Sequence, residues 1–169
     1  MKLVKPTLEL KESFYEYLRE WEKHNEKVVP TTLRKVNDQY EAYVKRWQNE
    51  SQGIIREGWV ANTTYFLVNE EGRILGSCNM RHELNKTLLQ IGGHVGYGVR
   101  PTERGKGYAT FMLKECLRHL KKMGIQKALI TCNDDNIGSK KVIMNNGGIQ
   151  DQSYTEQDGT IVNRFWIKL

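Results

Sequence analysis

The chain has 169 residues, 38% hydrophobic and 27% charged, so its composition excludes a disordered or fibrous protein and fits one domain over residues 1–169. It contains neither an export signal nor a run of about 18 apolar residues, which predicts a cytoplasmic protein with no membrane partner. A formal net charge of +6 favours anionic partners, but the basic residues are scattered among acidic ones, which argues against a nucleic-acid partner.

The first part of the chain predicts a short strand near residues 2–6, followed by two amphipathic helices. Apolar residues recur there at helical spacing in two stretches, which Pro30 and Thr31 separate. They are Leu10, Phe14, Leu18 and Trp21 in the first stretch and Val36, Tyr40, Tyr43, Val44 and Trp47 in the second.

From residue 63 the pattern becomes β-rich. Two strands are expected over residues 64–68 and 73–80, joined by the turn-rich residues 69–72 as a hairpin. A third strand is expected over residues 94–100.

After Pro101 an apolar stripe with helical spacing extends to Leu120, and Gly124 suits the end of that helix. Asp158 and Gly159 form a typical hairpin turn near the end of the chain. The remaining predicted elements are a strand over 127–131, a helix over about 136–146, and strands over 149–155 and 161–169. The predicted order is therefore βααβββαβαββ.

Residues 99–109 connect a predicted strand to a predicted helix and place two glycines and two cations, Arg104 and Lys106, at the helix entry. A helix N-terminus offers unpaired N–H groups and a positive dipole end, and glycines let an anion approach the backbone closely. This composition predicts a phosphate-binding site. A P-loop is excluded because Arg100 replaces its first glycine, and a dinucleotide-binding GxGxxG is excluded because Thr110 replaces its last glycine.

The same segment matches the GNAT acetyltransferase signature, in which Arg or Gln is followed three residues later by Gly and five residues later by Gly or Ala. Here these positions are Arg104, Gly107 and Ala109. The resemblance extends over about residues 64–148, and in residues 94–101 and 145–148 it is to a bacterial branch of the superfamily. It implies an α/β (α+β) fold with a mixed, mostly antiparallel twisted sheet flanked by helices, and acetyl-CoA as acyl donor without a metal.

The resemblance also implies which residues hold acetyl-CoA. The main chain near Val99 would pair with the pantetheine arm as an added strand does. Asn136 resembles the family asparagine that bonds the pantetheine, although Asn is also a common helix N-cap, and Asn133 lies just past the strand that would splay away from Val99. Ser139, at the start of the next helix, is also expected at the cofactor. The pyrophosphate would lie on the amides of Arg104, Gly105, Lys106, Gly107, Tyr108 and Ala109.

The catalytic groups are less well defined, because many relatives carry a tyrosine as general acid at the position of Ile143. Tyr97 and Ser139 are the candidate replacements. His94 is a candidate general base because an imidazole titrates near neutral pH, with a strand histidine bonded to a neighbouring backbone group as the alternative. Glu83 is a second candidate base.

The resemblance therefore implies direct, sequential transfer of an acetyl group from acetyl-CoA to a primary amine of a small molecule, peptide or protein, by a monomer or homodimer. A module that binds or senses acyl-CoA without turnover is the alternative, which the loss of the family tyrosine favours. The acceptor is not encoded in any recognisable motif.

Overall fold

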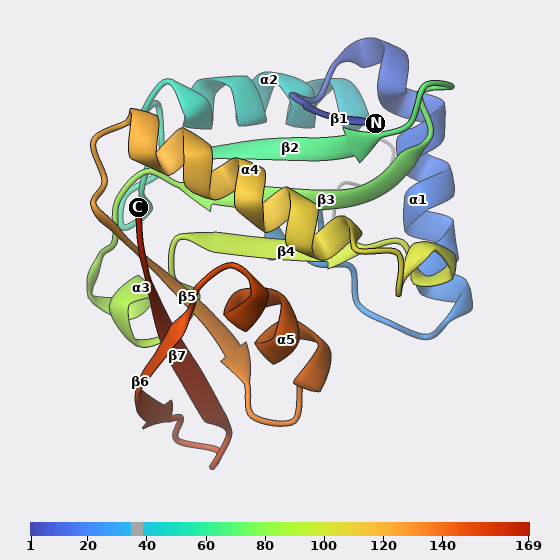
Figure 1. Ribbon diagram of the computed structural model, residues 1–169. Helices are drawn as coiled ribbons and strands as arrows, with labels where there is room; N and C mark the ends of the chain where they lie inside the picture. Colours follow the sequence, from blue (N-terminus) through green and yellow to red (C-terminus); the bar gives the residue numbers. More distant parts are fainter. Residues whose placement is uncertain (35–38) are drawn as a thin grey trace.

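The computed structural model describes residues 1–34 and 39–169, which contain two antiparallel sheets (Figure 1). The first sheet has the order β1-β2-β3-β4 and the second has the order β5-β7-β6. The strands of the first are β1 (Lys2–Val4), β2 (Asn62–Val68), β3 (Ile74–Arg81) and β4 (Val95–Val99). Those of the second are β5 (Lys127–Asn133), β6 (Ile149–Thr155) and β7 (Ile161–Lys168).

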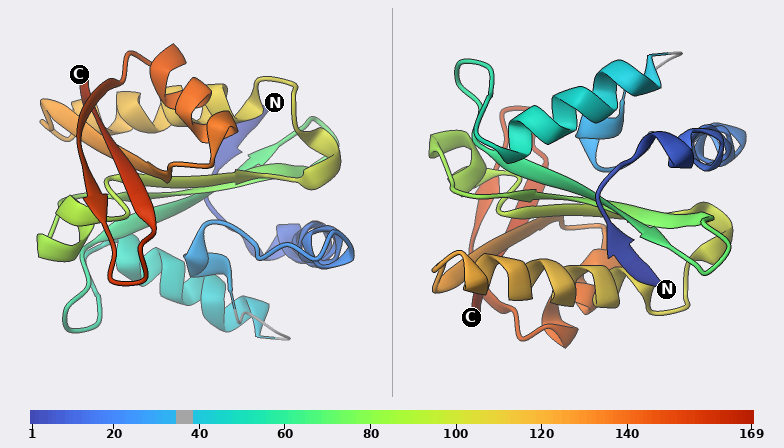
Figure 2. Two further views of the ribbon diagram at one scale, coloured as in Figure 1. Left: turned by 90° about the horizontal axis from the view of Figure 1, so that it is seen from below. Right: turned by 90° about the horizontal axis from the view of Figure 1, so that it is seen from above.

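Helices cover both faces of the first sheet. Figure 2 shows α1 (Lys11–Lys23) and α2 (Tyr40–Ser51) on one face and α4 (Tyr108–Lys122) and α5 (Ile137–Asn145) on the other. The short helix α3 (Lys86–Gln90) lies in the connection between β3 and β4. Single 3-10 turns occupy Leu8–Leu10, Thr31–Leu33 and Pro101–Glu103.

Each helical layer encloses its own hydrophobic core. On the α4 side the whole apolar stripe of α4 is buried against both sheets, as its spacing predicts: Met112, Leu113, Cys116, Leu117 and Leu120. On the other side the core is aromatic, with Phe14, Tyr40 and Trp47 packed around Phe66 of β2. Edge-to-face and tilted ring pairs of this kind add about 0.5–1.5 kcal/mol each beyond their burial.

The predicted strands and long helices are confirmed, with ends shifted by up to two residues except in α2, which begins at Tyr40 and extends to Ser51. The sequence pattern missed α3, which begins at an N-cap where Asn85 accepts a hydrogen bond from the Leu88 amide. The buried residues of α1 are Phe14, Tyr17 and Trp21. Leu18, which was predicted on the apolar face, is only half-buried. Val36 lies outside the described residues. Among the described residues no helix is long and apolar enough to cross a bilayer.

The two sheets meet at one end and separate toward the other. In the described part of the chain, β4 and β5 share no ladder of hydrogen bonds. They are joined at His94, whose amide donates to the Leu129 carbonyl at 2.7 Å. The Leu129 amide donates in return to His94 Nδ1 at 2.9 Å. Beyond this joint the strands diverge, as Figure 1 shows, and the splay exposes the free edge of β4.

Candidate functional site

The larger cavity lies in the splay and has a volume of about 660 Å³, within the range of small-molecule sites. Its walls come from three parts of the chain. The α1 end and the segment after it contribute Trp21, Glu26 and Val29. The segment from β4 into α4 contributes Tyr97, Gly98, Val99, Glu103, Arg104, Gly105, Gly107, Tyr108, Ala109 and Thr110. The start and body of α5 contribute Asn136, Gly138, Ser139, Lys141, Val142 and Asn145.

The loop before α4 forms a cradle of free backbone amides. Gly105 and Gly107 have φ of +78° and +79°, a left-handed conformation that glycine adopts without strain, and a Cβ on either would meet no atom within 4 Å. In the described structure the N–H groups of Gly105, Lys106 and Gly107 donate to no protein group, and the first amides of α4 are free as at any helix start. The Arg104 amide is the exception, since it donates to the Pro101 carbonyl at 3.4 Å. The cradle therefore fits a pyrophosphate, but begins one residue later than the sequence predicts.

Both cations of the predicted motif are paired with carboxylates. The Arg104 guanidinium donates to both oxygens of Glu26, at 2.8 and 2.6 Å, and lies 5.0 Å from the Trp21 ring centre. This hydrogen bonding lowers the pKa of Glu26. Lys106 Nζ donates to Glu103 at 2.8 Å and does not line the cavity. The cradle thus presents backbone N–H groups to a ligand, with the two side-chain charges already balanced.

Two hydroxyl groups meet across the splay. Tyr97 of β4 and Ser139 of α5 place their side-chain oxygens 2.8 Å apart, and both residues line the larger cavity. Burial raises the pKa of Tyr97, so this phenol stays protonated at neutral pH. Asn136 lines the same wall, while its Oδ1 accepts from the Ser139 amide at 2.9 Å and caps α5.

Three of the predicted site residues lie elsewhere, and Lys106 contributes only its backbone amide to the cradle. Lys106 and Asn133 do not line the larger cavity, and Glu83 is exposed in the connection after β3. His94 is 5% exposed and uses Nδ1 to accept from the Leu129 amide, so the geometry matches the alternative of a backbone-bonded strand histidine. Burial, together with the charge of Arg81, lowers its pKa.

Ile143 is fully buried in the core between α4 and the sheets and does not line the cavity. It packs against Gly148, where an added Cβ would lie 2.5 Å from Ile143 Cγ2. The residue at the position of the family tyrosine therefore stabilises α5 and does not face the cofactor site.

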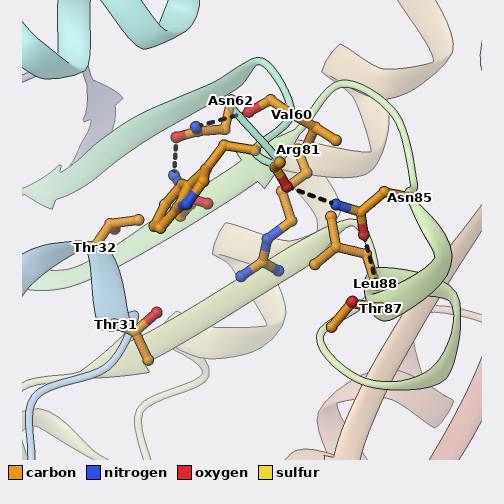
Figure 3. A pocket seen from close by; sticks show the side chains of 11 residues that line it. Thr31, Thr32, Val60, Asn62, Arg81, Asn85, Thr87 and Leu88 are labelled. Carbon is orange, nitrogen blue, oxygen red and sulfur yellow. Dashed lines mark hydrogen bonds between the residues drawn. The ribbon is translucent and has the colours of Figure 1, made fainter. Parts of the chain in front are cut away.

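A smaller cavity of about 280 Å³ was not predicted from the sequence (Figure 3). It lies beside β3 and the segment that follows Pro30, and most of its lining residues carry polar side chains. Its lining residues are Thr31, Thr32, Gly58, Trp59, Val60, Asn62, Asn79, Arg81, Asn85, Thr87 and Leu88. These residues come from five separate segments, so no local sequence motif marks the cavity; a charged residue, Arg81, near the end of a predicted strand was the only signal.

The chain resembles known acetyltransferases. The family model described as an acetyltransferase (GNAT) domain matches residues 1–149. No curated protein sequence matches significantly. Among solved structures, the microcin C7 self-immunity acetyltransferase MccE, in complex with acetyl-CoA and AMP, is 15% identical with a TM-score of 0.70, over 99% of this chain and 91% of that chain. A mutant of the spermidine N-acetyltransferase SpeG from Vibrio cholerae is 11% identical with a TM-score of 0.67, over 99% and 95%. At these identities the likeness extends to the fold alone.

Proposed function

Because the chain belongs to the GNAT acetyltransferase family, we propose that it transfers the acetyl group of acetyl-CoA directly to a primary amine. The observation that carries this proposal is the cradle of free amides at Gly105, Lys106 and Gly107, which opens into a cavity between two splayed sheets. MccE, a solved structure of the same fold, contains acetyl-CoA. The bacterial origin and cytoplasmic location stay predictions.

The residues of the larger cavity divide the binding of acetyl-CoA between them. The amides of the cradle and the first turn of α4 hold the pyrophosphate, since each charge-assisted hydrogen bond contributes about 1.5–3 kcal/mol. The free edge of β4 at Gly98 and Val99 bonds the pantetheine amides as an added strand. Asn136 contacts the pantetheine from the α5 side, although its Oδ1 already caps the helix.

Acetyl-CoA supplies an activated thioester, so the protein has to position the amine and assist the leaving sulfur. Tyr97 is the proton donor in this proposal, because its phenol is protonated, lines the cavity and is held by Ser139. Tyr97 extends from β4 to the α5 wall of the cavity, whereas position 143 lies on α5 itself. The new bond joins the amine nitrogen to the acetyl carbon, the carbon–sulfur bond breaks, the sulfur receives the Tyr97 proton, and the proton that the acylated nitrogen loses restores the Tyr97 phenol. Ser139 holds the phenol in place for this transfer.

The ammonium form of the acceptor has to lose a proton before attack. Neither His94 nor Glu83 lines either cavity. We therefore assign this proton to solvent water, with positioning of the two substrates, which can contribute about 7–11 kcal/mol, supplying most of the rate.

Calorimetric titration of the protein with acetyl-CoA, followed by mass spectrometry of a primary-amine library incubated with protein and acetyl-CoA, tests the proposal. We expect binding and one acetyl group added to at least one amine. An absence of acetyl-CoA binding by the folded protein contradicts the assignment of the larger cavity.

Binding with no acetylated product across the library supports the second candidate, a module that senses acyl-CoA without turnover. The aliphatic residue at position 143 favours that candidate, since it removes the acid found at that position in many relatives. The Tyr97–Ser139 pair favours the enzyme.

A further inference from the structure

The smaller cavity is lined by a half-buried cation that has no counterion among the described residues. Arg81 extends from β3 into the space between the Thr31 and Thr87 sides of the cavity (Figure 3). Its Nη1 donates to the Gly92 and Gly93 carbonyls at 2.8 and 3.2 Å. Its other two nitrogens donate to no group in the described part of the chain, and no described carboxylate lies within 4 Å of it. Burial lowers the pKa of Arg81 to about 10, so it keeps its charge at neutral pH.

Thr32 also lines the cavity, but its side-chain oxygen is closed off from solvent and is not offered to a ligand. This oxygen makes no hydrogen bond, and the residue is 7% exposed. The neighbouring amides are satisfied among themselves, since Asn79 donates to Asn62 at 2.6 Å and Asn62 donates to the Val60 carbonyl at 3.1 Å. The free nitrogens of Arg81 are therefore the donors that this cavity offers, and a small, negatively charged acceptor of hydrogen bonds fits them.

The cation lies beside the strand on which we place the reaction. A Cβ built on Gly96 of β4 would be 3.7 and 3.8 Å from the two terminal nitrogens of Arg81. The next residue is Tyr97, which lines the larger cavity. A ligand held by Arg81 is thus placed next to the segment of β4 that carries the proposed proton donor.

We propose that the smaller cavity binds the acceptor, and that the acceptor is a small primary amine that also carries a carboxylate, which pairs with Arg81. This inference rests on the proposed acetyl transfer. A bidentate pair is the geometry in which a guanidinium best binds a carboxylate. The positive charge also favours the neutral form of a nearby amine, which is the form that attacks.

The same lining argues against a polyamine acceptor. An acceptor with several ammonium groups needs carboxylates around it, and the described lining of the smaller cavity contains none. Its volume of about 280 Å³ suits a single amino acid better than a folded protein surface.

The test compares amines that differ only in the carboxylate. Alanine and ethylamine, phenylalanine and phenethylamine, and histidine and histamine form matched pairs, with β-alanine and 4-aminobutyrate as longer amino acids and spermidine as the polyamine. Initial rates with saturating acetyl-CoA are measured for each. We expect kcat/KM to be at least about 10-fold higher for the carboxylate-bearing member of the preferred pair.

Arg81→Gln should lower kcat/KM for that amino acid by about 10- to 100-fold and leave its decarboxylated counterpart within a few fold. If loss of the bonds to Gly92 and Gly93 unfolds the glutamine variant, Arg81→Lys takes its place in the test. This variant keeps the charge and should retain part of the preference. Arg56→Gln is the matched control, because Arg56 lies 4.3 Å over the Trp59 ring but does not line the cavity; it should keep the preference.

Equal or higher rates for the decarboxylated amines or spermidine overturn the inference, as does an Arg81→Gln variant that slows both members of a pair equally. Acetyl-CoA binding without acetylation of any panel member also overturns it, while leaving the larger cavity as the donor site. Failure of acetyl-CoA binding contradicts the proposed function itself. In that case calorimetric titration of the same amino acids into the protein still measures whether Arg81 binds a carboxylate.

Discussion

The Tyr97 hydroxyl lies 2.8 Å from the Ser139 hydroxyl, so a side chain of β4 meets a side chain of α5 across the open part of the splay. If Tyr97 protonates the leaving sulfur, Tyr97→Phe removes the hydroxyl group that donates this proton. Because the thiol has a pKa of about 8.5, its release as a free thiolate at pH 7 costs about 2 kcal/mol relative to the protonated thiol. We expect kcat to fall by up to about 30-fold, with acetyl-CoA affinity unchanged within a few fold, measured by single-turnover kinetics and calorimetry. Ser139→Ala should have a smaller effect. A Tyr97→Phe rate equal to that of the wild type would mean that the thiolate leaves unaided.

The phosphate cradle is tested at Gly107. Gly107→Asp places a carboxylate where the pyrophosphate lies against the backbone, and should lower acetyl-CoA affinity by at least about 100-fold, because several charge-assisted bonds are lost. Gly124→Ala is the control, since Gly124 has a similar φ of +85° at the other end of α4. It carries the same backbone strain, about 1–2 kcal/mol, without touching the cradle. Calorimetry on both folded variants separates the two effects, and undiminished affinity in Gly107→Asp would remove the cradle.

His94 is expected to act on stability, not on the proton of the amine. His94→Ala leaves the buried Leu129 amide without an acceptor, which should cost about 1–3 kcal/mol in the free energy of unfolding. Urea unfolding at neutral pH measures this cost. A rate loss of 100-fold or more with unchanged stability would instead restore His94 as the general base.

The lowered pKa of His94 also makes stability depend on pH. As the pH falls below about 6.5, the unfolded chain binds a proton that the native His94 does not, so stability falls with pH in that range. His94→Asn offers an oxygen to the Leu129 amide and does not titrate, and should therefore lose less stability between pH 7.5 and 5.5. His82, whose pKa burial also lowers, adds to the remaining loss. His24→Asn, at an exposed position, should behave as the wild type does.

Ile143→Tyr tests whether the family position can regain an acid. Because Ile143 is fully buried against Gly148, the larger ring should overpack the core and lower stability by about 1–3 kcal/mol, with no gain in rate. Met144→Tyr makes the same change at a neighbouring residue that is 62% exposed, and should change stability by less than about 0.5 kcal/mol. A tenfold faster Ile143→Tyr enzyme would show that sulfur protonation limits turnover.

Local periodicity was enough to predict the long helices, because each buries one face. The apolar stripe of α4 is an example, since every buried residue in it follows helical spacing. It was not enough for α3, which has only five residues, none of them buried, and begins at the Asn85 cap.

The cradle was predictable because its glycines and amides are contiguous in the sequence. Pairings between distant segments were not. Glu26 and Arg104 are joined through tertiary structure, as are His94 and Leu129, and no spacing rule connects them. The smaller cavity was missed for the same reason.

Residues 29–32, which follow α1, border both cavities, with Val29 on the wall of the larger one and Thr31 and Thr32 on the wall of the smaller one. Their position is fixed over the first sheet, where the Ser77 hydroxyl donates to the Val29 carbonyl at 3.1 Å. Any displacement of Val29 by one substrate therefore alters the free energy of binding of the other. Thermodynamic linkage requires this effect to be reciprocal: the factor by which acetyl-CoA changes the affinity for the acceptor is the factor by which the acceptor changes the affinity for acetyl-CoA. The four residues from Val29 to Thr32 are thus where we expect the binding of the two proposed substrates to be coupled.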